Sequence, residues 1–253
     1  MGQKLDARFG LDELVASAES ALHNGLTAVA ESVSSDVLVR QPDNARALYV
    51  HGAAAIRQGK MRPGLRDLER AAALAPRDAV VALELCRALL ENGRPADAER
   101  RLREALAGFR GPAERWRDFA ELLMRMGRHS DAVPLLGQVL MDNPSDAAAF
   151  NMRGYALQQL GDHTGAIGNF SQALVLQPGF HHAANNRGNS LLAQGRLAEA
   201  LKDYDAAIAV AADYFHAWSN RAKALERMGR TDDARASSER AAALAVRSGR
   251  TAA

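Results

Sequence analysis

Small, apolar and polar positions recur along this chain with one fixed period. The clearest marker is a glycine repeated every 34 residues, at Gly25, Gly59, Gly93, Gly127, Gly161, Gly195 and Gly229. Small residues fill the columns seven residues before and five residues after each glycine, and Leu, Phe or Tyr fill most places four residues before and nine residues after it. A fixed period of this length is typical of repeat architectures, so the sequence predicts seven copies of one structural unit.

Each 34-residue repeat has the composition of two helices joined by a turn. Leu, Ala, Glu, Arg and Gln favour helices and recur at helical spacing on both sides of the glycine, the usual residue where a helix ends. Prolines mark the junctions between repeats, at Pro42, Pro76, Pro144 and Pro178. Because one helical hairpin cannot bury both of its faces, we expect the hairpins to stack into an all-α solenoid.

The repeat resembles the tetratricopeptide repeat signature. The residues that carry the resemblance are Trp116, Phe119, Ala120, Leu123, Gly127, Ala132, Leu136, Val139 and Pro144, and residues 147–180 match equally well. The resemblance implies a right-handed superhelical solenoid of seven repeats, which span residues 11–44, 45–78, 79–112, 113–146, 147–180, 181–214 and 215–248. This phase makes 11–248 the solenoid, 1–10 an N-terminal segment and 249–253 a C-terminal tail.

The third repeat departs from the pattern at its end. Residues 107–112 read Ala-Gly-Phe-Arg-Gly-Pro, with two glycines and a proline outside its expected column. Both residue types interrupt helices, so this segment is a candidate hinge between the first three repeats and the last four.

Composition and missing motifs exclude several classes of function. The 32 Lys and Arg nearly balance the 30 Asp and Glu, which removes the charge excess typical of a nucleic-acid binder. The single cysteine, Cys86, excludes an intrachain disulfide, and no run approaches the roughly 18 apolar residues of a membrane span. Phosphate-loop, zinc-protease and serine-hydrolase motifs are missing. We therefore expect a cytoplasmic protein that is not an enzyme, with no catalytic residue, metal, cofactor, nucleic acid or membrane partner.

The resemblance implies a concave groove lined by the first helix of each repeat, which in this family holds an extended peptide or a partner helix. The groove positions are apolar in the first two repeats, for example Val15, Val50 and Ala53, charged in the third and fourth, and polar in the last three. We therefore expect a non-catalytic scaffold or adaptor that binds a protein or peptide partner. The predicted peptide-binding residues are Asn151, Tyr155, His182, Asn185, Asn186, Asn189, His216, Asn220 and Lys223.

Asparagine is the most specific of these residue types. Its amide places a donor beside an acceptor and can pair with the N–H and C=O of an extended peptide. Asn186 and Asn220 stand one period apart, where the repeat region of O-GlcNAc transferases resembles a ladder of asparagines, although Met152 interrupts the column one repeat earlier. In a carboxylate clamp, the rival binding mode, Asn189 and Asn220 would match two places but Asn185 would replace a required lysine.

Several alternatives stay open. The asparagines are also compatible with a simply solvated surface, and His182 and His216 share a column but lack the third ligand that a metal site needs. The chain is also compatible with the substrate-recognition region of a larger glycosyltransferase or sulfotransferase. A third alternative is a self-associating assembly unit, a homo-oligomer joined through terminal repeats whose last helix keeps apolar residues such as Leu244 and Val246.

Overall fold

The computed structural model describes residues 10–247, and these form fourteen α-helices and no strand. The predicted tail 249–253 and all of the predicted segment 1–10 except Gly10 lie outside the described residues. The helices are α1 (Leu11–His23), α2 (Thr27–Arg40), α3 (Ala45–Arg57), α4 (Met61–Leu74), α5 (Ala79–Glu91), α6 (Pro95–Leu106), α7 (Ala113–Arg125), α8 (His129–Asp142), α9 (Ala147–Gln159), α10 (His163–Leu176), α11 (His181–Ala193), α12 (Leu197–Val210), α13 (Phe215–Arg227) and α14 (Thr231–Arg247). The prediction of an all-α repeat solenoid is confirmed.

The glycine of each repeat ends its first helix. All seven turn glycines have positive φ angles, between 72° and 83°, a conformation that glycine adopts without steric cost. In the sixth repeat, the N–H of Gly195 donates to the carbonyl of Leu192 and the N–H of Arg196 to that of Leu191. These bonds satisfy carbonyls that the last helical turn leaves unpaired, so the chain reverses at this point.

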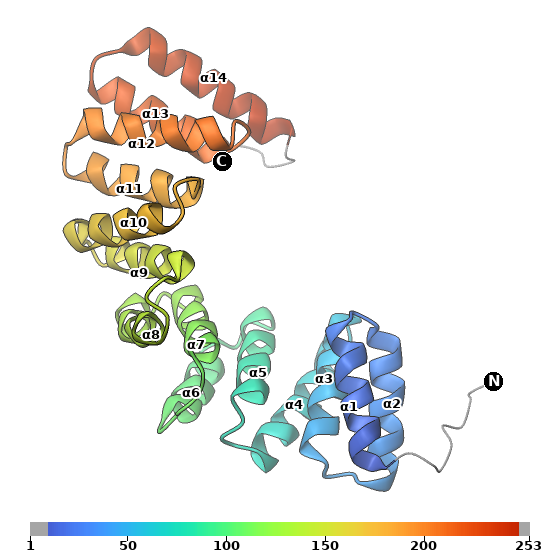
Figure 1. The fold of residues 1–253 in the computed structure, drawn as a ribbon. Coiled ribbons are helices and arrows are strands. Elements are labelled where there is room, and N and C mark those ends of the chain that lie inside the picture. Colours follow the sequence, from blue (N-terminus) through green and yellow to red (C-terminus); the bar gives the residue numbers. More distant parts are fainter. Residues whose placement is uncertain (1–9, 248–253) are drawn as a thin grey trace. The chain divides into compact units, whose positions relative to one another are not determined.

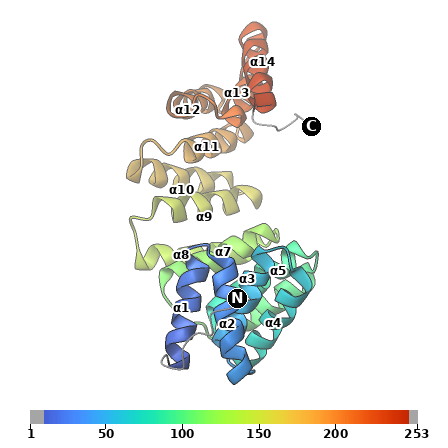
Figure 2. The same ribbon diagram turned by 90° about the vertical axis from the view of Figure 1, so that its right-hand side faces the viewer.

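Backbone contacts divide the chain into two compact units, Met1–Gly111 and Pro112–Ala253, which we call the N-terminal half (α1–α6) and the C-terminal half (α7–α14). Within each half, consecutive helices pack side by side (Figure 1), and Figure 2 shows α9, α10 and α11 as successive layers. The first helices of neighbouring repeats also touch, α1 with α3, α9 with α11 and α11 with α13. The boundary lies in the segment where the sequence predicts a hinge, and movement there stays a prediction.

The small columns allow helices of one repeat to approach closely. A Cβ atom added to Gly52 on α3 would lie 2.8 Å from the carbonyl oxygen of Gly64 on α4. In the sixth repeat, a Cβ on Gly188 would lie 2.6 Å from the ring of Tyr204. The small residue is therefore a packing requirement in both halves.

Three of the positions that the sequence places in an apolar groove of the first two repeats are buried. Val15 is 1% exposed and Val50 and Ala53 are 0% exposed, and all three belong to one buried core cluster. The cluster draws its members from α1, α2 and α3, and α1 packs against both α2 and α3. The expectation that Val15, Val50 and Ala53 line an open surface is therefore wrong.

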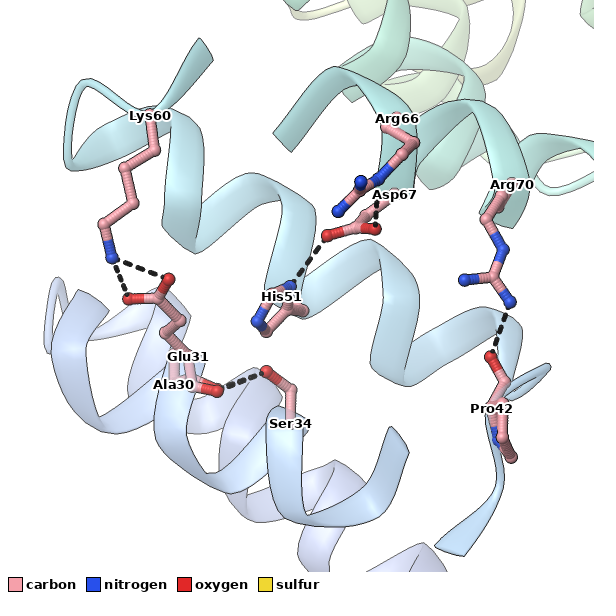
Figure 3. Close-up of polar contacts among 9 residues, drawn as sticks. All are labelled: Ala30, Glu31, Ser34, Pro42, His51, Lys60, Arg66, Asp67 and Arg70. Carbon is pink, nitrogen blue, oxygen red and sulfur yellow. Dashed lines mark hydrogen bonds and ion pairs between the residues drawn. The ribbon is translucent and has the colours of Figure 1, made fainter. Parts of the chain in front are cut away.

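Partly buried polar pairs join the two helices of several repeats. In the second repeat, His51 Nδ1 lies 2.8 Å from Asp67 Oδ2 (Figure 3), and in the sixth Arg187 donates to both oxygens of Asp203 at 2.7 and 2.6 Å. Arg187 also donates to Ser171 of the preceding repeat. The same two columns hold Arg153 with Asn169 and Arg221 with Ser237. Sequence reasoning missed these pairs, although their signal, a basic residue eight before the turn glycine and a polar residue eight after it, is visible.

Candidate binding site

Four asparagines form a chain of side-chain hydrogen bonds across the first helices of three repeats. Asn220 on α13 donates to Asn185 on α11 at 3.0 Å, Asn185 donates to Asn186 at 3.4 Å, and Asn186 donates to Asn151 on α9 at 3.3 Å. We call these four residues the asparagine chain and the surface of α9, α11 and α13 that carries them the first-helix face. The structure thus brings together four of the residues predicted to bind a peptide.

The members of the asparagine chain differ in exposure. Asn185 is only 3% exposed, and its amide oxygen and nitrogen both bond to neighbours in the chain. Asn151, Asn186 and Asn220 are partly exposed. Asn185 therefore supports the side chains on either side of it, while the other three present their amides to solvent.

A glutamine that the sequence analysis did not select holds the middle of the chain. Gln158 on α9 donates from Nε2 to the backbone carbonyl of Asn186 at 2.9 Å and to the hydroxyl of buried Ser190 at 2.7 Å. These bonds tie α9 to α11 directly beneath Asn186. The available signal was a polar residue three positions before the turn glycine Gly161, where five of the other six repeats carry Leu, Ile or Met and the last carries Glu226.

Asn189 is held from the second helix of its own repeat. The hydroxyl of Tyr204 on α12 donates to Asn189 Oδ1 at 2.9 Å, and Tyr204 is 0% exposed. Burial raises the pKa of Tyr204, so this hydroxyl stays protonated and remains a donor. The predicted peptide-binding residue Asn189 is partly exposed, but its carbonyl is already committed to the protein core.

Three histidines surround the ring of Tyr214 at the start of α13. The centroids of His181, His182 and His216 lie 5.2, 5.0 and 5.5 Å from that of Tyr214, in edge-to-face contacts. We call these four residues the imidazole cluster. Its members His182 and His216 are exposed and were predicted to bind a peptide, whereas His181 and Tyr214 were not selected.

The cluster perturbs the titration of its members. Burial, followed by the positive charges of protonated His181 and His216, lowers the pKa of His182. Burial also raises the pKa of Tyr214. Within residues 10–247 no group of three His, Cys, Asp or Glu side chains is arranged to hold a metal ion.

The starts of the three helices explain where the cluster forms. α9 begins after Asp146, whose carboxylate accepts the N–H of Ala149 at 2.9 Å and so caps the helix. At the same position, α11 and α13 have Phe180 and Tyr214, which make no side-chain cap. Their aromatic rings instead pack against the neighbouring histidines.

The two remaining predicted residues flank the asparagine chain. Tyr155, four residues after Asn151 on α9, is 37% exposed and contacts His129 edge-on at 6.0 Å. Lys223, three residues after Asn220 on α13, is exposed. The first-helix face therefore offers amides, with an aromatic ring on α9 and a cation on α13.

One group in the N-terminal half has the residue types of a hydrolytic triad. Ser34, His51 and Asp67 come from three successive helices (Figure 3). Ser34 is 0% exposed, however, and its hydroxyl donates to the carbonyl of Ala30 at 2.6 Å. A nucleophile needs access to substrate, so this group is a packing feature and does not support catalysis.

Comparisons with known proteins give one family. A tetratricopeptide repeat model matches residues 55–117 and 89–154, and a second such model matches residues 188–229, so that the matches cover more than half of the chain. No curated protein matches this chain in sequence. In the described part of the chain, no helix is both long and apolar enough to span a bilayer.

Solved structures share the fold at low sequence identity. The C-terminal part of a tetratricopeptide repeat protein from Cytophaga hutchinsonii is 16% identical, with a TM-score of 0.69 over 91% of this chain and 95% of that chain. A repeat protein from Parabacteroides merdae is also 16% identical, with a TM-score of 0.67 over 92% and 93%. YrrB, described as having an unusual peptide-binding site, is 17% identical, with a TM-score of 0.61 over 73% and 95%.

Proposed function

Because the chain belongs to the tetratricopeptide repeat family, whose fold is typical of protein–protein interaction scaffolds, we propose that it binds an extended segment of a partner protein on its first-helix face. The asparagine chain is the observation that carries this proposal. Amide side chains pair with a peptide main chain whatever its side chains are, and a row of them follows an extended segment. The peptide-binding site described for YrrB shows that a protein of similar fold binds peptides.

The hydrogen-bonding capacity that remains on this face supports the proposal. After the bonds within the chain, Asn151 keeps both N–H groups of its amide, and Asn186 and Asn220 keep one each. Because Asn185 bonds to the amides of both Asn186 and Asn220, a ligand would find these two side chains already ordered. Each hydrogen bond contributes a net of about 1 kcal/mol, so a few of them, opposed by peptide ordering, give affinities in the micromolar range.

A substitution of two asparagines tests this function. Display of random 12-residue peptides against the full chain should select binders, and the Asn186→Ala/Asn220→Ala variant should bind them about thirtyfold more weakly, from the loss of about 2 kcal/mol. Asn24→Ala/Asn92→Ala is the matched control, because both residues are exposed in the N-terminal half. Equal binding by both variants, or selection of no peptide, would contradict the proposal.

The other functions expected from the sequence stay predictions. Self-association has one supporting feature, since Val246 on α14 is 74% exposed. Light scattering tests it, because a monomer at high concentration contradicts end-to-end assembly. No feature of the described residues favours a glycosyltransferase or sulfotransferase region, and the cytoplasmic location is likewise a prediction.

A further inference from the structure

The first-helix face is nearly free of carboxylates. α9 and α11 contain no Asp or Glu, and α13 contains only Glu226. The preceding first helix, α7, differs sharply, with Glu114, Asp118 and Glu121. An anionic ligand would therefore meet almost no like charge along α9, α11 and α13, whereas on α7 it would meet three carboxylates, which the three arginines of that helix balance.

The asparagine chain leaves donors free for a ligand. The amide oxygens of Asn185, Asn186 and Asn151 each accept a bond within the chain, and only the oxygen of Asn220 receives none from the described residues. Every exposed member still keeps at least one N–H. These N–H groups can donate to a carboxylate, which when ionised only accepts hydrogen bonds and binds such donors more strongly than a neutral acceptor does.

Uncompensated positive charge lies on the same face. Lys223 is exposed, and no carboxylate of the described residues, including Glu226, lies within ion-pair distance of it. The arginines of these helices have other partners: Arg187 pairs with Asp203, Arg221 with Asp205, Arg153 donates to Asn169 and lies over the ring of Phe150, and Arg227 donates to a backbone carbonyl. Lys223 is therefore the permanent cation most available to a ligand.

We propose that the partner segment is acidic: an extended stretch rich in Asp or Glu whose carboxylates accept hydrogen bonds from Asn151, Asn186 and Asn220 and pair with Lys223. The inference rests on the proposed function and narrows it to one class of ligand. A segment with many acidic residues also repels itself and stays extended, which suits a row of amides.

The imidazole cluster adds a dependence on pH. The pKa of free His182 is lowered below 6.5 by burial, by His181 on its own helix and by His216 on α13, and the remaining titratable group against it is Tyr214, which stays neutral. His182 is therefore mostly neutral at pH 7 when the face is empty. A bound carboxylate favours the protonated form, so an acidic peptide should bind more tightly as the pH falls from 7 toward 5.5.

Three capped 12-residue peptides of one design test the inference. They alternate Ser with Glu, Gln or Lys, and their binding to the full chain is measured by calorimetry at low salt. We expect the Ser-Glu peptide to bind about tenfold more tightly than the Ser-Gln peptide and to weaken with added salt, as charge pairing requires. The Ser-Lys peptide should not bind.

Two variants and one further ligand complete the test. Lys223→Gln should weaken binding of the Ser-Glu peptide about threefold or more and leave the affinity for the Ser-Gln peptide unchanged. Lys202→Gln, at an exposed lysine on the second helix α12, is the matched control and should change neither. A 12-nucleotide poly-dT strand should bind more weakly than the Ser-Glu peptide, and tighter binding of the strand would overturn the inference in favour of nucleic acid.

The outcomes separate this inference from the proposed function. Equal binding of the Ser-Glu and Ser-Gln peptides, or preference for Ser-Lys, overturns the inference and leaves the scaffold function standing. Binding of none of the peptides also overturns it, and the random-peptide display then decides whether the scaffold function fails as well.

Discussion

Equivalent positions on α3 and α11 differ in burial although the two repeats have the same helix-turn-helix structure. Val50 and Ala53 on α3 correspond, four periods later, to Asn186 and Asn189 on α11. The pair on α3 is fully buried, whereas the pair on α11 is partly exposed. The 34-residue period therefore fixes the backbone, and the side chains at these positions decide whether the first-helix surface closes into core or stays open for a ligand.

A second comparison concerns the pairs that join the helices within each repeat. His51 with Asp67 in the second repeat and Arg187 with Asp203 in the sixth occupy the same columns. Only Arg187 holds both oxygens of its partner and also reaches a hydroxyl of the preceding repeat. Arg187 therefore joins α11 to α12 within the sixth repeat and to α10 of the fifth repeat.

The largest effect on stability should come from removing Arg187. Arg187→Met leaves the carboxylate of Asp203, 6% exposed, without its cation, and this should cost about 3 kcal/mol of unfolding free energy. Urea unfolding followed by tryptophan fluorescence measures the loss in the C-terminal half, since both tryptophans, Trp116 and Trp218, lie there. The double variant Arg187→Met/Asp203→Leu should recover most of it. A loss of less than about 1 kcal/mol of unfolding free energy in Arg187→Met would show that the pair does not stabilise this half.

A smaller effect on stability should follow from exchanging side chains between the equivalent positions Val50 on α3 and Asn186 on α11. Val50→Asn places an amide where Val50 is 0% exposed, which should cost the N-terminal half about 2 kcal/mol. Cys86 reports on this half, because it is buried and burial raises the pKa of its thiol to about 12, so a thiol reagent reacts mainly after opening. Asn186→Val, the reciprocal change, should alter stability by less than about 1 kcal/mol but remove two of the three hydrogen bonds of the asparagine chain. If Cys86 reacts equally fast in the two variants, the contrast between the buried position on α3 and the open position on α11 is wrong.

The sequence was sufficient to predict the fold because the 34-residue period can be read directly from it. The turn glycines mark the end of every first helix, and the small columns mark the close approaches. It was not sufficient for the site. Asn185 and Asn186 are adjacent in sequence but point about 100° apart around the helix, and only the packing of α11 between α9 and α13 decides that Asn185 is buried.

Other parts of the site depend on side chains that meet across repeats. Tyr214 lies more than thirty residues from His181, and no local pattern shows that their rings touch. The burial of Val50 and Ala53 likewise depends on the packing of α1 against α3, which brings residues of both helices into one core cluster. Periodicity identifies which positions share a face, but the distance between neighbouring helices decides which of those positions remain open.

The most direct test of the central claim observes the asparagine side chains while a peptide binds. In the ¹⁵N-labelled full chain titrated with the Ser-Glu peptide, the side-chain amide signals of Asn151, Asn186 and Asn220 should shift together with one dissociation constant, and those of exposed Asn24 and Asn92 should not move. Binding that leaves the first three signals in place, or that shifts mainly residues of the N-terminal half, would contradict the account.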